Sequence, residues 1–196
     1  MTTADGQITA KRQRRADARR NYDLLVAAAR ETFAESGPEA SLNEITRRAG
    51  VGPGTLYRHF PTRSALLTAV LKDRIETLCS HAERLSTADS ADDALAEWLG
   101  AFLVHARVNH GLGGAQMIEE PDTPGFDCHR LLLDAMAALL VRAQRSGTAR
   151  ADLAPGDLLQ LVVGIALSTA RSDDDPDRPG RLLSLVLDAA HTRAKR

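Results

Sequence analysis

Apolar residues recur along this chain at spacings of three and four, and this periodicity restricts the fold more than any other feature of the sequence. Leu25, Ala29 and Phe33 follow one another every fourth residue. They predict an amphipathic helix over residues 18–35. No segment alternates apolar and polar residues with the β-branched enrichment that is typical of strands. The sequence therefore predicts an all-α chain of about nine helices.

The composition excludes several other classes of protein. Hydrophobic residues make up 43% and charged residues 26% of the 196 residues, which is enough for a core and argues against general disorder. The two cysteines, Cys79 and Cys128, are too few for a disulfide scaffold or a four-cysteine zinc site. No apolar run approaches the roughly 18 residues of a membrane span, and the polar, basic start is unlike a secretory signal. We therefore expect a cytoplasmic protein without membrane contact.

Positive charge is concentrated in the first third of the chain. Residues 1–63 hold 11 Lys and Arg against 7 Asp and Glu, a net charge of +4, whereas residues 64–196 hold 14 against 19, a net charge of −5. A basic front part on an acidic remainder indicates a polyanionic partner for the front part alone. Residues 1–16, which are polar and then basic, are expected to form a disordered arm.

Residues 41–60, SLNEITRRAGVGPGTLYRHF, carry the clearest functional signal. They predict two short helices joined by a four-residue turn, with Ser41 and Glu44 forming a capping box and Gly50 taking a positive φ. The apolar positions would pack both helices against the first helix, as in a helix-turn-helix. The second short helix then presents polar side chains outward, where a helix in the major groove meets base edges.

The alternative is a chance helical hairpin, since short hairpins are common. However, the capping box, the glycine turn, the polar outward face and the basic residues upstream all agree with one another. Their agreement favours a DNA-binding helix-turn-helix.

The stretches AAARETFAESG, SLNEITRRAGVGPGTLYRHF and FPTRSALL together resemble the DNA-binding domain of the TetR family of transcriptional regulators. The resemblance covers residues 18–68, and length, order and register agree. It implies a three-helix DNA-binding domain over residues 17–63 and a helical effector-binding and dimerisation domain over residues 64–196. The positions that it assigns to DNA binding are Ser41, Asn43, Pro53, Gly54, Thr55, Tyr57, Arg58, His59 and Arg63.

Two of these arginines have distinct expected roles. Arg58 lies on the recognition helix at a position that varies across the family, so it is the candidate for sequence discrimination. Arg63 takes the place of a basic residue that, with the positive end of the fourth helix, holds a backbone phosphate.

The last two predicted helices are apolar on more than one face, and such helices need a second surface to cover them. The alternative is that both are buried within their own domain. TetR-like proteins pair as two-fold dimers through these helices, so the resemblance implies a homodimer and an inverted-repeat operator. The expected interface residues are Leu158, Leu161, Val162, Ile165, Leu182, Leu183 and Val186.

The resemblance also implies a pocket for a small-molecule effector, built from the fourth to the seventh helix. Aromatic, histidine and methionine side chains are candidates for its lining, although ordinary core packing is the alternative for each one. The candidates are Trp98, Phe102, His105, Met117, Phe126 and Met136.

Histidines 105, 110 and 129 with Asp127 and Cys128 do not have the spacing of a metal motif. The run Asp127-Cys128-His129 also lacks a third group that would orient a nucleophile. We therefore expect no enzyme activity, no metal and no cofactor. The sequence is interpreted as a ligand-responsive repressor that binds a palindromic operator in double-stranded DNA as a homodimer. The alternatives are a ligand-independent DNA-binding protein and a TetR-like activator.

Overall fold

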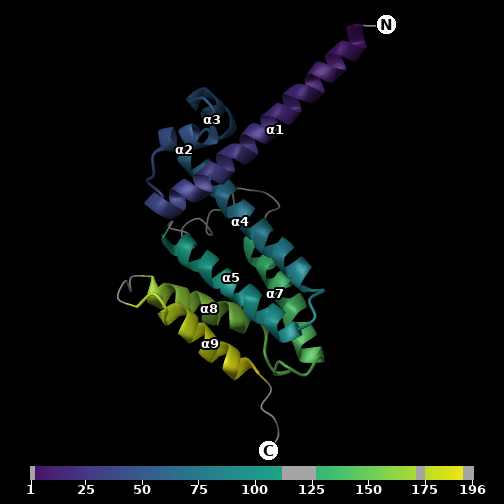
Figure 1. Ribbon diagram of the computed structural model, residues 1–196, viewed down its shortest axis with the longest axis vertical. Helices are drawn as coiled ribbons and strands as arrows, with labels where there is room; N and C mark the ends of the chain where they lie inside the picture. Colours follow the sequence, from purple (N-terminus) through teal and green to yellow (C-terminus); the bar gives the residue numbers. More distant parts are fainter. Residues whose placement is uncertain (1–2, 112–126, 171–174, 192–196) are drawn as a thin grey trace, which may run out of the picture. The chain divides into compact units, whose positions relative to one another are not determined.

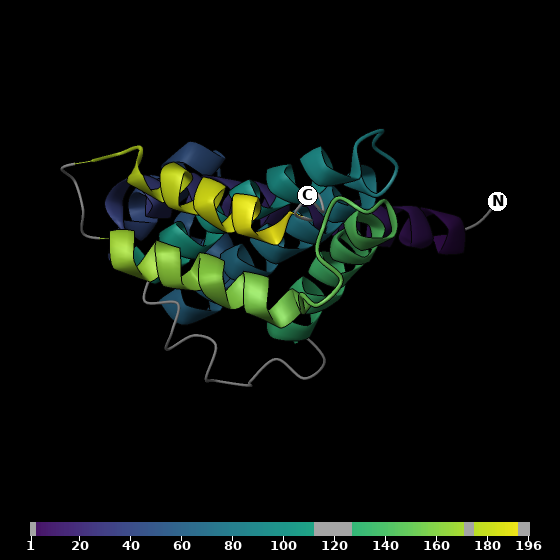
Figure 2. The ribbon, with the colours of Figure 1, turned by 90° about the horizontal axis from the view of Figure 1, so that it is seen from below.

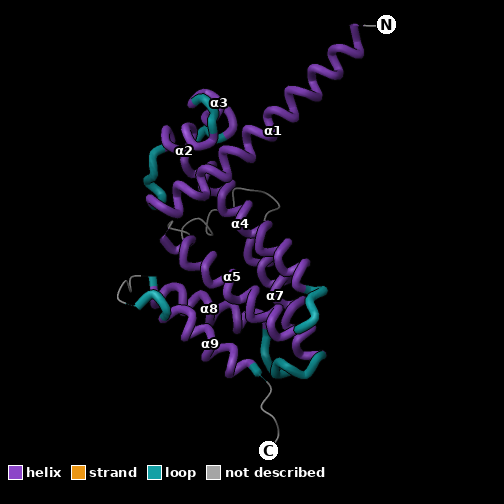
Figure 3. The backbone as a smooth tube through the Cα atoms, in the orientation of Figure 1, coloured by secondary structure: helices purple, strands orange, loops and turns teal. Residues whose placement is uncertain are grey.

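The computed structural model describes residues 3–111, 127–170 and 175–191, and these ranges contain eight helices (Figure 1). The helices are α1 (Thr3–Ser36), α2 (Leu42–Ala49), α3 (Pro53–His59), α4 (Arg63–Leu85), α5 (Ala91–Gly111), α7 (Cys128–Arg145), α8 (Pro155–Thr169) and α9 (Arg178–Ala190). Within the described ranges there is no strand (Figure 3), and a single isolated bridge pairs Ala149 with His191. The prediction of an all-α chain is confirmed, and the helix count is close to the predicted nine.

The chain divides into two compact units, Met1–Asp73 and Arg74–Arg196, and α4 contributes residues to both. In the first unit α1 packs against α2 and α3. The core of this unit consists of fully or nearly fully buried apolar side chains, among them Leu25, Ala29, Phe33, Ile45, Leu56, Phe60, Leu66 and Val70.

Helix α1 is longer than the sequence pattern predicts. Residues 3–16, expected as a disordered arm, belong to this helix, which continues past α2 and α3 (Figure 1). Alanine, arginine, lysine and glutamine, which are frequent in this stretch, all have high helix propensity. Extending a helix whose other end is already packed also avoids the cost of nucleation. The expectation of disorder is therefore corrected by the structure.

Glycine at position 50 closes α2 and starts the turn to α3. Its φ of 67° is in the left-handed region that favours glycine. In this conformation the Gly50 N–H donates to the carbonyl of Arg47 at 3.2 Å, and the Val51 N–H donates to that of Thr46 at 3.1 Å. The predicted positive φ is confirmed, and it explains how two short helices are joined by so few residues.

The predicted capping box is not formed. Ser41 is the N-cap of α2, but its side chain makes no capping hydrogen bond. The Glu44 carboxylate instead accepts from the guanidinium groups of Arg47 and Arg48, at 2.6 and 2.8 Å. Hydrogen bonds between two charged groups are stronger than one to a neutral backbone N–H, so the arginines attract this carboxylate away from the helix start. In α4, by contrast, Thr62 Oγ1 caps the helix start by accepting from the Ala65 N–H at 3.0 Å.

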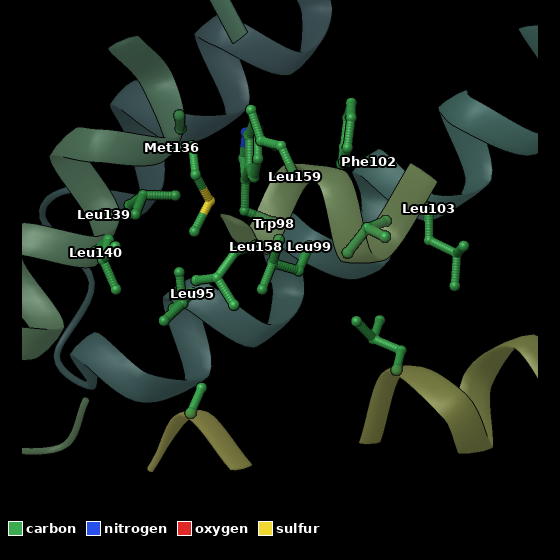
Figure 4. Packing of buried hydrophobic residues seen from close by; sticks show 14 of the residues in the cluster. Leu95, Trp98, Leu99, Phe102, Leu103, Met136, Leu139, Leu140, Leu158 and Leu159 are labelled. Carbon is green, nitrogen blue, oxygen red and sulfur yellow. The ribbon is translucent and has the colours of Figure 1, made fainter. Parts of the chain in front are cut away.

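In the second unit α5 contacts α7, α8 and α9, and α8 lies beside α9 (Figures 1 and 2). Figure 4 shows Trp98 and Met136 among the leucines of this core. Trp98 is completely buried, and its indole Nε1 donates to the carbonyl of Leu78 at 2.9 Å. None of the described helices is both long and apolar enough to cross a membrane.

Polar side chains also hold the second unit together at its ends. The Arg142 guanidinium of α7 donates to the carbonyls of Leu85 and Ala88, in the turn between α4 and α5. His191, which follows α9, lies with Nε2 2.8 Å from Oδ2 of Asp92 at the start of α5. These contacts connect segments that are far apart in the sequence.

Candidate nucleic-acid interface

Helix α3 is held by one buried side chain and presents Tyr57 and Arg58 outward. Leu56 is 1% exposed and anchors the helix in the core of the first unit. Tyr57 is 55% exposed, Arg58 is exposed and Thr55 is half-buried. Since α3 has only seven residues, this single anchor leaves a phenol, a guanidinium and a hydroxyl on one short, accessible helix.

The start of α3 and the start of α2 are also accessible. Pro53 and Gly54 lie in the first turn of α3 and are exposed. Proline suits this position because backbone N–H groups in the first turn of a helix have no acceptor within the helix. Ser41 and Asn43 at the start of α2 are exposed as well. Both short helices therefore offer their N-terminal turns, where backbone N–H groups and the helix dipole favour anions.

His59 is half-buried like Thr55, but it differs from the other candidates on α3 in its ring contact with α1. Its ring meets that of Tyr22 on α1 edge to face, with centroids 6.1 Å apart. Tyr22 also packs on Phe60, with centroids 5.0 Å apart. His59 thus takes part in the packing between α1 and α3, which the sequence pattern alone did not indicate.

Arg63 connects α4 to the turn between α1 and α2. Its guanidinium donates to the carbonyls of Pro38 and Ala40, at 2.8 and 2.6 Å. A charged donor shared by two carbonyls fixes the segment that leads into Ser41 and Asn43. This positioning contact was not predicted, and the phosphate contact expected of Arg63 stays a prediction.

Four charged side chains join the end of α1 to α2. Arg48 donates to both carboxylate oxygens of Glu35, at 2.9 and 2.7 Å, and also to Glu44. The hydrogen bonds from Arg47 and Arg48 lower the pKa of Glu44 to about 2. The two arginines of α2 are therefore matched by two glutamates and add little uncompensated positive charge. The spacing of Glu44 from Arg47 and Arg48 could have indicated part of this cluster, but the contact with Glu35 depends on the tertiary fold.

In the part of the chain that the structure describes, no group of three or more His, Cys, Asp or Glu side chains is placed to hold a metal ion. Cys79 and Cys128 are half-buried, and burial raises the pKa of both thiols. His129, beside Cys128 on α7, is exposed.

Comparison with known proteins relates both units to one family. Residues 25–70 match the family model described as bacterial regulatory proteins, tetR family. Residues 90–189 match the model described as transcriptional regulator SbtR-like, C-terminal domain. A TetR transcriptional regulator from Streptomyces coelicolor is 35% identical, with a TM-score of 0.76, and the alignment covers 88% of this chain and 99% of that one. The chain belongs to the TetR family.

Further relatives agree with this assignment. A TetR regulatory protein from Mycobacterium vanbaalenii is 34% identical with a TM-score of 0.71, over 91% of this chain and 99% of that one. An HTH-type transcriptional regulator of Staphylococcus aureus strain MRSA252 is 28% identical over 97 residues, or 49% of this chain and 52% of the relative. The chain spans about half or less of the length of the curated relatives that it matches, 52% and 39%. It is a TetR-family transcriptional regulator with a DNA-binding helix-turn-helix.

The effector-pocket candidates of this TetR-family chain lie mainly in the core of the second unit. Trp98 stacks on Phe102 with centroids 5.6 Å apart, and Phe102 stacks on His105 at 6.1 Å. Trp98, Phe102 and Met136 are buried, as the core-packing alternative expects (Figure 4). Met117 and Phe126 lie outside the described residues.

His105 is the candidate with the most unusual electrostatics. Burial, helped by the positive charge of Arg74, lowers the pKa of His105 to about 4. The imidazole is therefore neutral at physiological pH, and it forms the polar end of the row that begins at Trp98.

The dimer candidates divide into two groups. Leu158, Val162, Ile165 and Leu183 are buried in the core of their own unit, as the alternative of burial within the domain expects, and their part in an interface stays a prediction. Leu161 is 51% exposed, and Leu182 and Val186 are half-buried. On the same two helices, Val163, Leu167 and Leu185 are exposed as well. Because α8 is apolar on nearly every face, its sequence does not show which face turns inward.

Proposed function

We propose that this chain is a ligand-responsive repressor that binds an inverted-repeat operator as a homodimer. DNA binding is assigned to residues 17–63, and effector binding and dimerisation to residues 64–196. The proposal rests mainly on the exposure of Tyr57 and Arg58 on α3, a helix that buried Leu56 anchors in the core.

The side chains of α3 match the chemistry of the major groove. An arginine such as Arg58 can donate two hydrogen bonds to the O6 and N7 atoms of guanine, and the methyl group of Thr55 can contact thymine. The Tyr57 hydroxyl suits a phosphate oxygen, as does the N-terminal turn of α2 beside Asn43. Phosphate contacts supply most of the affinity, whereas base contacts supply the sequence preference.

The exposed apolar side chains of the second unit support a homodimer. Leu161, Val163 and Leu167 on α8 and Leu185 on α9 are at least 38% exposed, and α8 and α9 lie side by side (Figure 2). Exposed leucines and valines on two adjacent helices are stabilised when a second copy covers them. A two-fold dimer would present its two recognition helices to half-sites about 34–36 Å apart.

Regulation by a ligand requires two states of the dimer. A ligand that prefers the state whose recognition helices no longer fit successive major grooves shifts the population away from DNA. Moving such an equilibrium from 1:99 to 99:1 takes about 5.5 kcal/mol of differential binding. Helix α4 contributes to both units, so its displacement is the proposed route from effector to DNA.

Selection of bound duplexes from a random pool tests the DNA-binding part of the proposal. The purified chain should enrich an inverted repeat whose half-sites are centred about one helical turn apart. Enrichment of a single half-site would contradict the dimer, and no enrichment would contradict sequence-specific binding.

A second function, ligand-independent DNA binding, is favoured by one observation. Trp98, Phe102 and Met136 fill the core that an effector would have to enter. A screen of apolar and charged metabolites for shifts in melting temperature separates the two functions. A ligand that raises the melting temperature and releases the selected duplex supports the repressor with an effector, whereas no shift with any compound supports ligand-independent binding.

A further inference from the structure

The N-terminal part of α1 carries a dense positive charge that the helix-turn-helix does not use. Residues 11–20 are all exposed. Asp17 is the single acidic residue in this range. The basic residues are Lys11, Arg12, Arg14, Arg15, Arg19 and Arg20. Because these residues are helical, each charge points in a defined direction rather than sampling many.

Two of these basic residues, Lys11 and Arg15, lie in line with the face of α1 that packs against the helix-turn-helix. Tyr22 marks this face by its ring contacts with His59 and Phe60. Intervals of seven and eleven residues are close to two and three turns of an α-helix. Arg15 and Lys11, which precede Tyr22 by these intervals, therefore lie within about 20° of its direction. The same row continues through the buried residues Ala29 and Phe33, seven and eleven residues after Tyr22.

The one acidic group of this segment lies on the other side of the helix. Asp17 is five residues before Tyr22, which places it roughly 140° away from the row of Lys11 and Arg15. Its carboxylate accepts a hydrogen bond from Gln13 Nε2 at 3.3 Å on that side. The face that continues toward α2 and α3 is thus basic and free of carboxylates between residues 11 and 20.

The row from Tyr22 to Lys11 is longer than the major groove is wide. At 1.5 Å per residue, Arg15 and Lys11 lie about 10 and about 16 Å along the helix axis from Tyr22. Tyr22 itself contacts His59 at the end of α3. The major groove is about 12 Å wide, so the distance from Tyr22 to Lys11 is long enough to extend from the groove to a flanking phosphate.

We propose that Lys11 and Arg15 form a second DNA-contacting surface, presented by a preformed helix to the phosphate backbone flanking the recognition site. This inference rests on the proposed DNA-binding function and adds a contact outside the helix-turn-helix. A preformed helix loses less conformational entropy on binding than a disordered arm with the same charges. Helicity as well as charge is therefore part of the proposal.

A matched pair of double variants tests whether the face matters. Lys11→Ala with Arg15→Ala removes two charges from the row, whereas Arg12→Ala with Arg20→Ala removes two charges that point roughly 80° and 160° away from Tyr22. Alanine preserves the helix in both. With the selected duplex, the slope of log affinity against log salt should fall by about 2 per protomer in the first variant and remain nearly unchanged in the second. An equal fall of the salt slope in both double variants would show an effect of net charge alone and would overturn the proposal.

A third variant, Ala16→Pro, tests whether the helix matters. Proline in a helix interior interrupts the helix but leaves all six basic charges in place. Circular dichroism should show lost helix, and the affinity and salt slope should fall to those of the Lys11→Ala, Arg15→Ala variant. Unchanged binding after verified loss of helix would show that a flexible arm suffices, and would overturn the proposal.

An Arg58→Ala variant measured on the same duplex separates failure of this inference from failure of the proposed function. If the wild-type chain selects no duplex, the proposed function fails and this inference fails with it. If the wild type selects a duplex and Arg58→Ala relaxes the base preference, but the two double variants lose affinity equally, only the inference about α1 fails.

Discussion

The two units differ in where they place their apolar side chains. In the first unit most large apolar residues are buried, with Leu24 exposed to 39%, and the outward face of α3 carries Tyr57 and Arg58. In the second unit a large apolar core around Trp98 is accompanied by exposed Leu161 and Leu185 on α8 and α9. The first unit thus has a buried apolar core that supports the polar outward face of α3. The second unit has a buried apolar core and, in addition, exposed apolar side chains on α8 and α9.

The difference indicates two kinds of partner. Hydrogen-bond donors on a short rigid helix suit a nucleic acid, whose base edges and phosphates present many acceptors. Apolar side chains on two adjacent helices suit another protein surface of the same kind.

The largest effect is expected from charge placed on the exposed apolar face of the second unit. Replacing Leu161 and Leu185 together with Glu would bury unpaired carboxylates in a dimer interface, at a cost of several kcal/mol. We expect the double variant to be monomeric by sedimentation and to bind the selected duplex at least about 100-fold more weakly. Val141→Glu, at an exposed position on α7, is the matched control and should leave both properties unchanged. A double variant that stays dimeric would show that this face is not the interface.

A smaller effect is expected from the buried polar group of the second unit. The pKa of His105 is lowered to about 4, so between pH 6.5 and 4 the unfolded chain binds a proton that the folded chain does not. Stability therefore falls as the pH falls through this window. The free energy of unfolding, measured at pH 7 and pH 4.5, should drop by about 2–3 kcal/mol more in the wild type than in His105→Gln. Equal drops in both would show that His105 is not held neutral.

Two roles of Arg63 in the first unit are separated by two substitutions. Arg63→Ala should lower the free energy of unfolding by about 1–2 kcal/mol, because the carbonyls of Pro38 and Ala40 lose a charged donor. It should also reduce the salt slope of DNA binding by about 1 if Arg63 contacts a phosphate. Arg63→Lys keeps the charge but not the guanidinium geometry, so it should restore the salt slope without restoring stability. Full recovery of stability in Arg63→Lys would contradict the positioning contact.

The smallest effect is expected at His191, and its sign is opposite to that of His105. Asp92 and the carbonyl of Leu187 both accept from the imidazole, and these hydrogen bonds raise the pKa of His191. The stabilisation is present below the unfolded pKa, about 6.5, and is lost as the pH rises through the folded value. Since the side chain is 43% exposed, we expect a loss below about 1 kcal/mol. Thermal melts at pH values below and above about 6.5 should show this loss of stability with rising pH in the wild type and not in Asp92→Asn.

Local sequence patterns were sufficient to predict most of the fold. The spacing of Leu25, Ala29 and Phe33 predicted a buried helix face, and Gly50 was placed correctly at a positive φ. Both features depend on interactions within a few residues along the chain. The resemblance carried by residues 18–68 then supplied the family, which the comparisons confirm.

Features that depend on competing partners could not be predicted in the same way. Glu44 has a backbone N–H within reach, but the neighbouring arginines attract it more strongly. The inward and outward faces of α8 cannot be distinguished when Leu158 and Leu161 are equally apolar, since only the neighbouring helices decide which is covered. Likewise, whether the charged start of α1 is helical depends on its attachment to a helix that is already packed.

We propose that the outward face of α3 reads base pairs, and substitution of Arg58 tests this proposal. The measurement is a titration of a panel of duplexes, each with one base pair of the selected operator changed, with the wild type and with Arg58→Ala. We predict that the variant loses about 1–3 kcal/mol of discrimination at one position in each half-site and keeps it elsewhere. An equal loss of affinity for every duplex, or no loss for any, would contradict the claim.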